Sequence, residues 1–239
     1  MADALIAIAS FIGGAIGAIS GFGIGSIITP VLAARVGMKA AVAAVAIPHV
    51  VGTAVRFFLL RRDIDRNVLL TFGLASLAGG LAGALIHAWL TSRWLTWLLG
   101  ALLIFSGITG LLGITFRFRR GAALIAGAFS GILGGLVGNQ GGIRAGALMG
   151  FDVRKEAFVA TSTAVALLVD GARVPVYLVN QGDVLRGMIP TIAIATIAVV
   201  VGTIVGRLML RRINEATFKR VVSALIAALG VWLIASAYS

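Results

Sequence analysis

Two short glycine-rich segments with polar groups suited to anions interrupt long apolar stretches of this chain. The first runs from Ser20 to Ser26 and the second from Gly138 to Arg144. The first backbone N–H groups of a helix lack partners and carry roughly half a positive charge, so a helix that starts at a break attracts anions. Glycine also lets a ligand approach the backbone closely. We therefore expect a small anion to bind at Gly21, Phe22, Gly23, Gly25, Ser26, Gly138, Asn139, Gln140, Gly141, Gly142 and Arg144.

Arg144 is the sharpest candidate among these residues. Its guanidinium suits planar and tetrahedral oxyanions because its N–H donors can bind two oxygens together. An arginine at mid-membrane costs about 2.5–3.5 kcal/mol on insertion scales, so a role there is expected. The alternatives are a structural ion pair or a position nearer the interface. The glycines themselves have another use, close helix contact, which we expect at Gly79, Gly83, Gly202 and Gly206.

A second group of residues is expected to couple or gate transport. Asp170 and Arg173 are three residues apart, so a helix places them side by side, either as a structural pair or as a gate. His49 titrates near physiological pH and could carry a proton, or it could simply be hydrogen-bonded. The hydroxyls of Thr161 and Ser162 could contact a ligand or bond back to their own helix.

The composition places the surrounding elements in a lipid bilayer. Of the 239 residues, 60% are hydrophobic and 12% are charged, and the chain has 32 glycines and no cysteine. One water-soluble globule could not bury so much apolar surface. We predict a single all-α polytopic transmembrane domain over residues 1–239. Eight apolar helices have roughly the 20 residues that a bilayer requires: 4–20, 39–60, 68–90, 94–114, 121–137, 156–179, 187–210 and 217–235.

The chain also contains an internal repeat. Four glycine pairs, beginning with Gly14 and Gly131, are each 117 residues apart, and Arg56 and Arg173 keep that offset. We assign repeat 1 to about residues 4–114 and repeat 2 to about residues 121–236. In each repeat a short apolar piece, 24–36 or 143–151, is too short to cross a bilayer and is expected to be re-entrant. Arg56 lies near a helix end, so we expect it to snorkel to the headgroups.

Charge distribution favours inverted repeats, each a Gly-broken re-entrant hairpin followed by three transmembrane helices. With that topology, twelve basic residues of the loops and helix ends fall on one side and only Arg35, Lys39, Arg93 and Arg186 on the other. With parallel repeats the split is seven against nine, which is no bias. The positive-inside rule therefore places both termini outside the cytoplasm.

Other classes of protein fit the chain poorly. The net charge of +12 is explained by cytoplasmic helix ends, and no basic run is interleaved with exposed aromatics as in nucleic-acid binders. An intramembrane enzyme needs a nucleophile, a base or a metal cluster, and the two isolated histidines lack metal-ligand spacing. We expect no enzyme activity, no cofactor, no metal and no nucleic-acid partner. The sequence does not indicate an oligomeric state.

The chain resembles the sulfite exporter TauE/SafE family of bacterial membrane proteins over almost its whole length. The likeness rests on the first glycine-rich break followed by Pro30, on Ala160 to Thr163, and on Gly182-Asp183-Val184. It departs from the usual pattern at Ser26, where another glycine is common, and at Pro48-His49, where Thr-Ser is frequent. The resemblance implies secondary transport of sulfite, organosulfonates or related small sulfur-containing anions across the bacterial inner membrane.

These observations together predict an alternating-access transporter that binds a small oxyanion between the two breaks near the bilayer midplane. Export coupled to proton entry is the expected energetics, with Asp170 or His49 as the proton carrier. The partners are then a small anion, protons and the lipid bilayer. The alternatives are a passive anion channel, whose wall would use the same glycines and Arg144, and an importer of a related anion.

Overall fold

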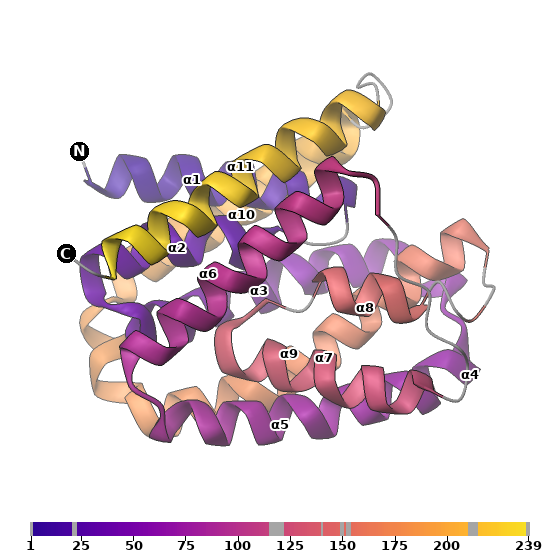
Figure 1. Ribbon diagram of the computed structural model, residues 1–239, viewed down its shortest axis with the longest axis horizontal. Coiled ribbons are helices and arrows are strands. Elements are labelled where there is room, and N and C mark those ends of the chain that lie inside the picture. The colour runs from indigo at the N-terminus through magenta and orange to yellow at the C-terminus, as the bar shows by residue number, and fades with distance from the viewer. Residues whose placement is uncertain are drawn as a thin grey trace.

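The protein is an all-helical, multi-pass membrane protein (Figure 1). The computed structural model describes residues 2–20, 23–114, 122–139, 141–148, 151, 154–209 and 215–237. Within these residues no strand occurs. Five of the described helical segments are long and apolar enough to cross a bilayer: Met38–Asp63, Arg66–Trp89, Ser92–Leu111, Glu156–Gly187 and Ile189–Leu208.

The chain begins with two helices on either side of the first break, α1 (Ala2–Ser20) and α2 (Ile24–Val36). Gly23 precedes α2 with φ of 128°, a value that favours glycine because it has no Cβ. At the far end of α2, Arg35 donates a hydrogen bond to Asp3 over 3.1 Å. The end of α2 therefore lies beside the start of α1, and the two helices run back along each other.

Three longer helices and the short turns between them complete the described part of the first half. After α3 (Met38–Leu60) come a single 3-10 turn, η1 (Arg61–Asp63), and the short helix α4 (Arg66–Val68). The carboxylate of Asp65 caps α4 by accepting from the N–H groups of Asn67 and Val68. A π-helical turn, η2 (Leu69–Gly73), leads into α5 (Leu74–Trp89), and α6 (Ser92–Leu111) follows.

Five α-helices lie in the described residues of the second half: α7 (Ala123–Val137), α8 (Gly141–Leu148), α9 (Lys155–Gly187), α10 (Ile189–Met209) and α11 (Glu215–Ser236). One predicted link between spans is present only as a kink. Residues 180–186 were expected to link two spans, and Gln181, with φ of −135° and ψ of 18°, does leave the helical conformation there. The residues that follow it are helical to Gly187, so the kink divides α9 into two helical parts.

The helices pack in pairs that join the two halves. α1 packs on α10, α5 on α7, and α6 on α11. The helices α6 and α11 lie side by side in Figure 1. Glycine makes the first two contacts close, as predicted. A Cβ on Gly79 would lie 2.1 Å from the carbonyl oxygen of Ala128, and one on Gly202 would lie 2.1 Å from that of Phe11. Gly83 and Gly206 contact the same neighbouring helices in the same way.

The centre of the bundle is formed by α3 and α9, which pack against each other. The first half of α3 is a run of small apolar residues, 40–46, all of them buried. Farther along, both helices bury polar side chains that a lipid-facing helix could not carry: Thr53 and Arg56 on α3, and Thr161, Ser162, Thr163, Asp170 and Arg173 on α9. The polar side chains that could bind an ion or a proton therefore lie in the core of the helix bundle.

Candidate functional site

The two glycine-rich breaks, which are far apart in sequence, meet inside the bundle. A Cβ on Gly25 would lie 2.7 Å from the carbonyl oxygen of Gly138, so only glycine allows this approach. Between the breaks is a cavity with about 10 Å³ of free volume, about what one water molecule needs. Its lining comes from both breaks and from α3: Gly23, Gly25, Ser26, His49, Gly138, Asn139, Gly141 and Arg144.

Two helices begin at this cavity. At the start of α2, the backbone N–H of Ile27 donates a hydrogen bond to the carbonyl of Gly23 over 3.1 Å. The N–H groups of the three residues before Ile27 belong to the first turn, whose donors have no acceptor within the helix. α8 starts at Gly141, which lines the same cavity. The positive ends of two helix dipoles therefore converge on one point, as an anion site requires.

Two polar side chains of the second break reinforce this positive field. Asn139 is 8% exposed, and its amide nitrogen has no hydrogen-bond partner among the described residues. Arg144 is 3% exposed and donates from Nε to the Ser162 hydroxyl over 3.0 Å. Its charge also interacts with those of Arg56, Asp170 and Arg173. A buried amide donor and a buried guanidinium at two helix N-termini can together bind an oxyanion.

A titratable pair adjoins the cavity. Nδ1 of His49 lies 2.7 Å from Oδ2 of Asp170, across the interface between α3 and α9. Arg173 binds the other carboxylate oxygen through Nε at 2.9 Å and Nη2 at 2.8 Å. The predicted Asp170–Arg173 contact is therefore present. The sequence could not reveal that His49, which is 121 residues away, shares the same carboxylate.

Arg56 was predicted wrongly. It does not snorkel to the headgroups but is 5% exposed and lies in the protein core. It donates from Nη1 to the carbonyl of Gly17 and from Nη2 to the Thr53 hydroxyl, the latter over 3.2 Å. The carbonyl of Gly17 belongs to the last turn of α1, where helix carbonyls lack partners, so a buried acceptor was available.

Three side chains bind the carbonyl end of α7, immediately before the second break. Arg173 donates to the carbonyl of Gly134 over 3.1 Å, Tyr177 to that of Gly135, and Nδ1 of His87 to that of Leu136 over 2.7 Å. Uncovered, these carbonyls would present the negative end of a helix dipole to the anion. The four-residue spacing of Arg173 and Tyr177 puts them on one face of α9 and was the available sequence signal.

The sequence matches the family Sulfite exporter TauE/SafE over residues 6–233. The chain belongs to this family. It is therefore a membrane transporter of sulfur-containing anions. No curated protein and no solved structure matches the chain. The family thus names the cargo class, while the arrangement of the site in this TauE/SafE member comes from the contacts described above.

The other site residues predicted for this TauE/SafE protein do not all line the cavity. Thr161 does not line the cavity; its hydroxyl accepts from the backbone N–H of Asp65 over 2.9 Å. Ser162 approaches the cavity only through its bond with Arg144. Gly142 lies in α8. Gly21, Phe22 and Gln140 lie outside the described residues. Within the described part of the chain, no group of three or more carboxylates and histidines could hold a metal.

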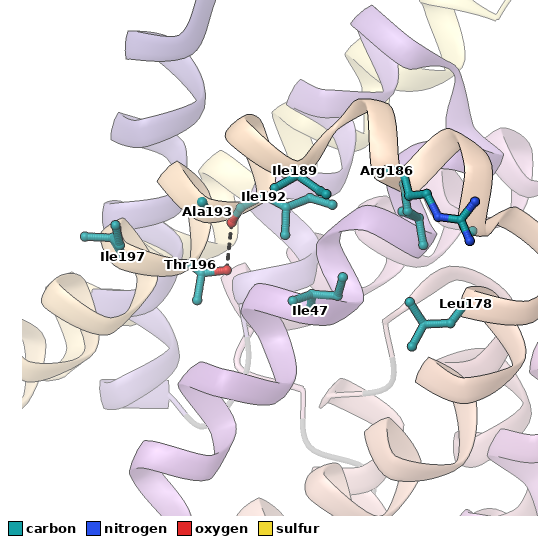
Figure 2. A pocket seen from close by; sticks show the side chains of 10 residues that line it. Ile47, Leu178, Arg186, Ile189, Ile192, Ala193, Thr196 and Ile197 are labelled. Carbon is teal, nitrogen blue, oxygen red and sulfur yellow. Dashed lines mark hydrogen bonds between the residues drawn. The ribbon is translucent and has the colours of Figure 1, made fainter.

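A larger cavity of about 640 Å³ lies elsewhere, between α3, α9 and α10 (Figure 2). Figure 2 shows aliphatic side chains around it, among them Ile47, Leu178 and Ile192, with Arg186 at one end. The Thr196 hydroxyl in its wall is bonded to the carbonyl of Ile192. This cavity offers an oxyanion few donors, so its size does not make it the transport site.

Proposed function

We propose that this TauE/SafE member is a secondary carrier that binds sulfite or an organosulfonate between its two breaks and exposes the anion alternately to each side of the membrane. The observation that carries the proposal is the convergence of two helix N-termini, Asn139 and Arg144 on one buried cavity. The cavity holds about 10 Å³, so it must widen to admit an oxyanion. This requirement favours a carrier over a passive channel, which needs a continuous pore.

Inverted repeats supply the two alternating arrangements in this proposal. If a two-fold axis relates the two repeats, α1 corresponds to α7 and α10 corresponds to α5. The packing of α1 on α10 then has its counterpart in the packing of α7 on α5, and both contacts occur. The Arg35–Asp3 bond supports a re-entrant first hairpin. The start of α1 and the end of α11 lie at the same end of the molecule (Figure 1). We place both termini outside, in the bacterial inner membrane.

Proton entry drives export in the proposed cycle through the His49–Asp170 pair. The imidazole lines the cavity, and its Nδ1 is held by the carboxylate at 2.7 Å. Exchange requires the two ligands to cross on different half-cycles. The anion crosses outward while the His49–Asp170 pair holds no extra proton, and the pair carries the proton inward while the cavity is empty.

The test is sulfite flux in proteoliposomes with and without a pH gradient. A carrier gives saturable flux that the gradient accelerates, whereas a channel gives rapid flux that does not saturate. Arg144→Ala is expected to abolish saturable flux and Arg144→Lys to retain part of it, since lysine keeps the charge but loses the planar fork. Arg207→Ala is the matched control, because Arg207 lies in α10 with an exposed side chain. Undiminished flux in Arg144→Ala would contradict the proposed site.

A further inference from the structure

Arg56 and Arg173 occupy equivalent places in the two halves and make equivalent backbone bonds. Each donates from Nη1 to a carbonyl 39 residues earlier, Gly17 for Arg56 and Gly134 for Arg173. Both carbonyls lie in the last turn or so of the helix that precedes a break. Each guanidinium thus covers the negative end of a helix that points toward the cavity.

The two arginines differ in the side chain three residues before them. Arg173 is paired with the carboxylate of Asp170, whereas Arg56 binds the neutral hydroxyl of Thr53. All four side chains are at most 5% exposed. Asp170 is the one carboxylate among the buried side chains that the structure describes, and it already serves Arg173 and His49. Arg173 therefore has a carboxylate in contact, whereas Arg56 has none in contact and is attracted to Asp170 only over a longer distance, and in this sense the charge of Arg56 is unmatched.

The unmatched charge lies next to the candidate site. Thr53 joins Arg56 to His49, since its hydroxyl is 3.2 Å from Nη2 of Arg56 and 3.5 Å from Nδ1 of His49. His49 lines the cavity, and Arg56 also repels the charge of Arg144. A buried cation without a carboxylate is costly in a low-dielectric interior, and an anion in the cavity relieves that cost.

We propose that Arg56 determines which charge state of the anion the site selects, favouring divalent over monovalent oxyanions of similar size. This inference rests on the proposed anion site between the breaks. Arg56 acts through the field that it adds to the cavity, so it is a positioning residue and not a ligand. The attraction between Arg56 and the anion grows in proportion to the anion's charge.

The test compares the affinities of purified protein for sulfite and thiosulfate, both divalent at about pH 9, with that for monovalent methanesulfonate. At this pH imidazole is neutral, so the titration of His49 does not enter. Removing the unmatched charge by Arg56→Gln, or matching it by Thr53→Asp, is expected to lower the divalent-to-monovalent affinity ratio about tenfold. Arg56→Lys and Thr53→Asn are the matched controls, and the ratio should remain near that of the wild type.

A variant that is expected to change the affinity ratio in the opposite direction keeps the test decisive if Arg56→Gln or Thr53→Asp does not fold. Asp170→Asn releases the charge of Arg173, so it should raise the same ratio. A ratio that stays constant in the folded members of this set overturns the inference, even if both affinities fall together, because a structural role weakens every anion alike. If the wild type binds none of the three anions, the proposed function itself is wrong.

Discussion

At the scale of single residues, the account depends on how closely the two breaks approach. Gly25→Ala is expected to weaken sulfite binding about tenfold or more, because the new Cβ would lie 2.7 Å from the Gly138 carbonyl oxygen and push the breaks apart. Calorimetric titration of the purified protein measures this. The control is Gly171→Ala, where a Cβ meets nothing within 4 Å. Equal losses in both variants would show that the breaks need no close contact.

His49 supports a second prediction at this scale. His49→Gln keeps a polar side chain beside Asp170 but cannot carry a proton at physiological pH. Sulfite exchange at equal pH on both sides should persist, whereas acceleration by a pH gradient should disappear. Proteoliposome flux measured under both conditions separates the two effects. Gradient-driven flux at the wild-type rate would remove His49 from the coupling mechanism.

The sequence revealed local relations between residues and missed the distant ones. The Asp170–Arg173 pair follows from helical spacing, and the breaks follow from their glycines. The positions of Arg56 and His49 do not, because their partners Gly17 and Asp170 are 39 and 121 residues away. Arg56 was misplaced because it lies near the end of its helix, where a long side chain usually reaches the headgroups, and its sequence neighbours do not show that the carbonyl of Gly17 lies beside it.

At the scale of elements, the carbonyl end of α7 must be covered if an anion is to sit beside it. Tyr177→Phe uncovers the Gly135 carbonyl, so it should destabilise the protein by about 1 kcal/mol and also weaken sulfite binding. Thr196→Val is matched to it, since the Thr196 hydroxyl also donates to a backbone carbonyl, that of Ile192, over 2.7 Å. Thermal unfolding with and without sulfite separates the effects. If Thr196→Val weakens binding equally, covering the carbonyl has no special importance.

The helix order was predictable because apolar runs of about 20 residues have few alternatives in a bilayer. The predicted helix end at residue 179 lies close to the non-helical Gln181, but the helical turns that follow it were not predictable. Gly182 and its polar neighbours resemble a loop, and yet the chain is helical to Gly187. Whether such residues form a loop or a kinked helix depends on tertiary packing.

At the scale of the whole molecule, inverted repeats predict which residues face each compartment. Single cysteines replacing Asp3 and Arg186 should react with an impermeant reagent from outside the cell, and one replacing Arg66 only from the cytoplasm. The chain has no cysteine of its own, so labelling needs no background variant. Labelling in intact and permeabilised cells provides the comparison. Residues 66 and 186 on one side of the membrane would exclude the inverted topology.

The central claim is that one anion is bound by both breaks together. The most direct measurement is calorimetric titration of sulfite into the wild type, Ser26→Ala and Asn139→Ala, which change one break each. The account predicts one sulfite per chain and affinities about five- to tenfold weaker in each variant. Two independent sulfite sites, or an unchanged affinity when either break is altered, would contradict it.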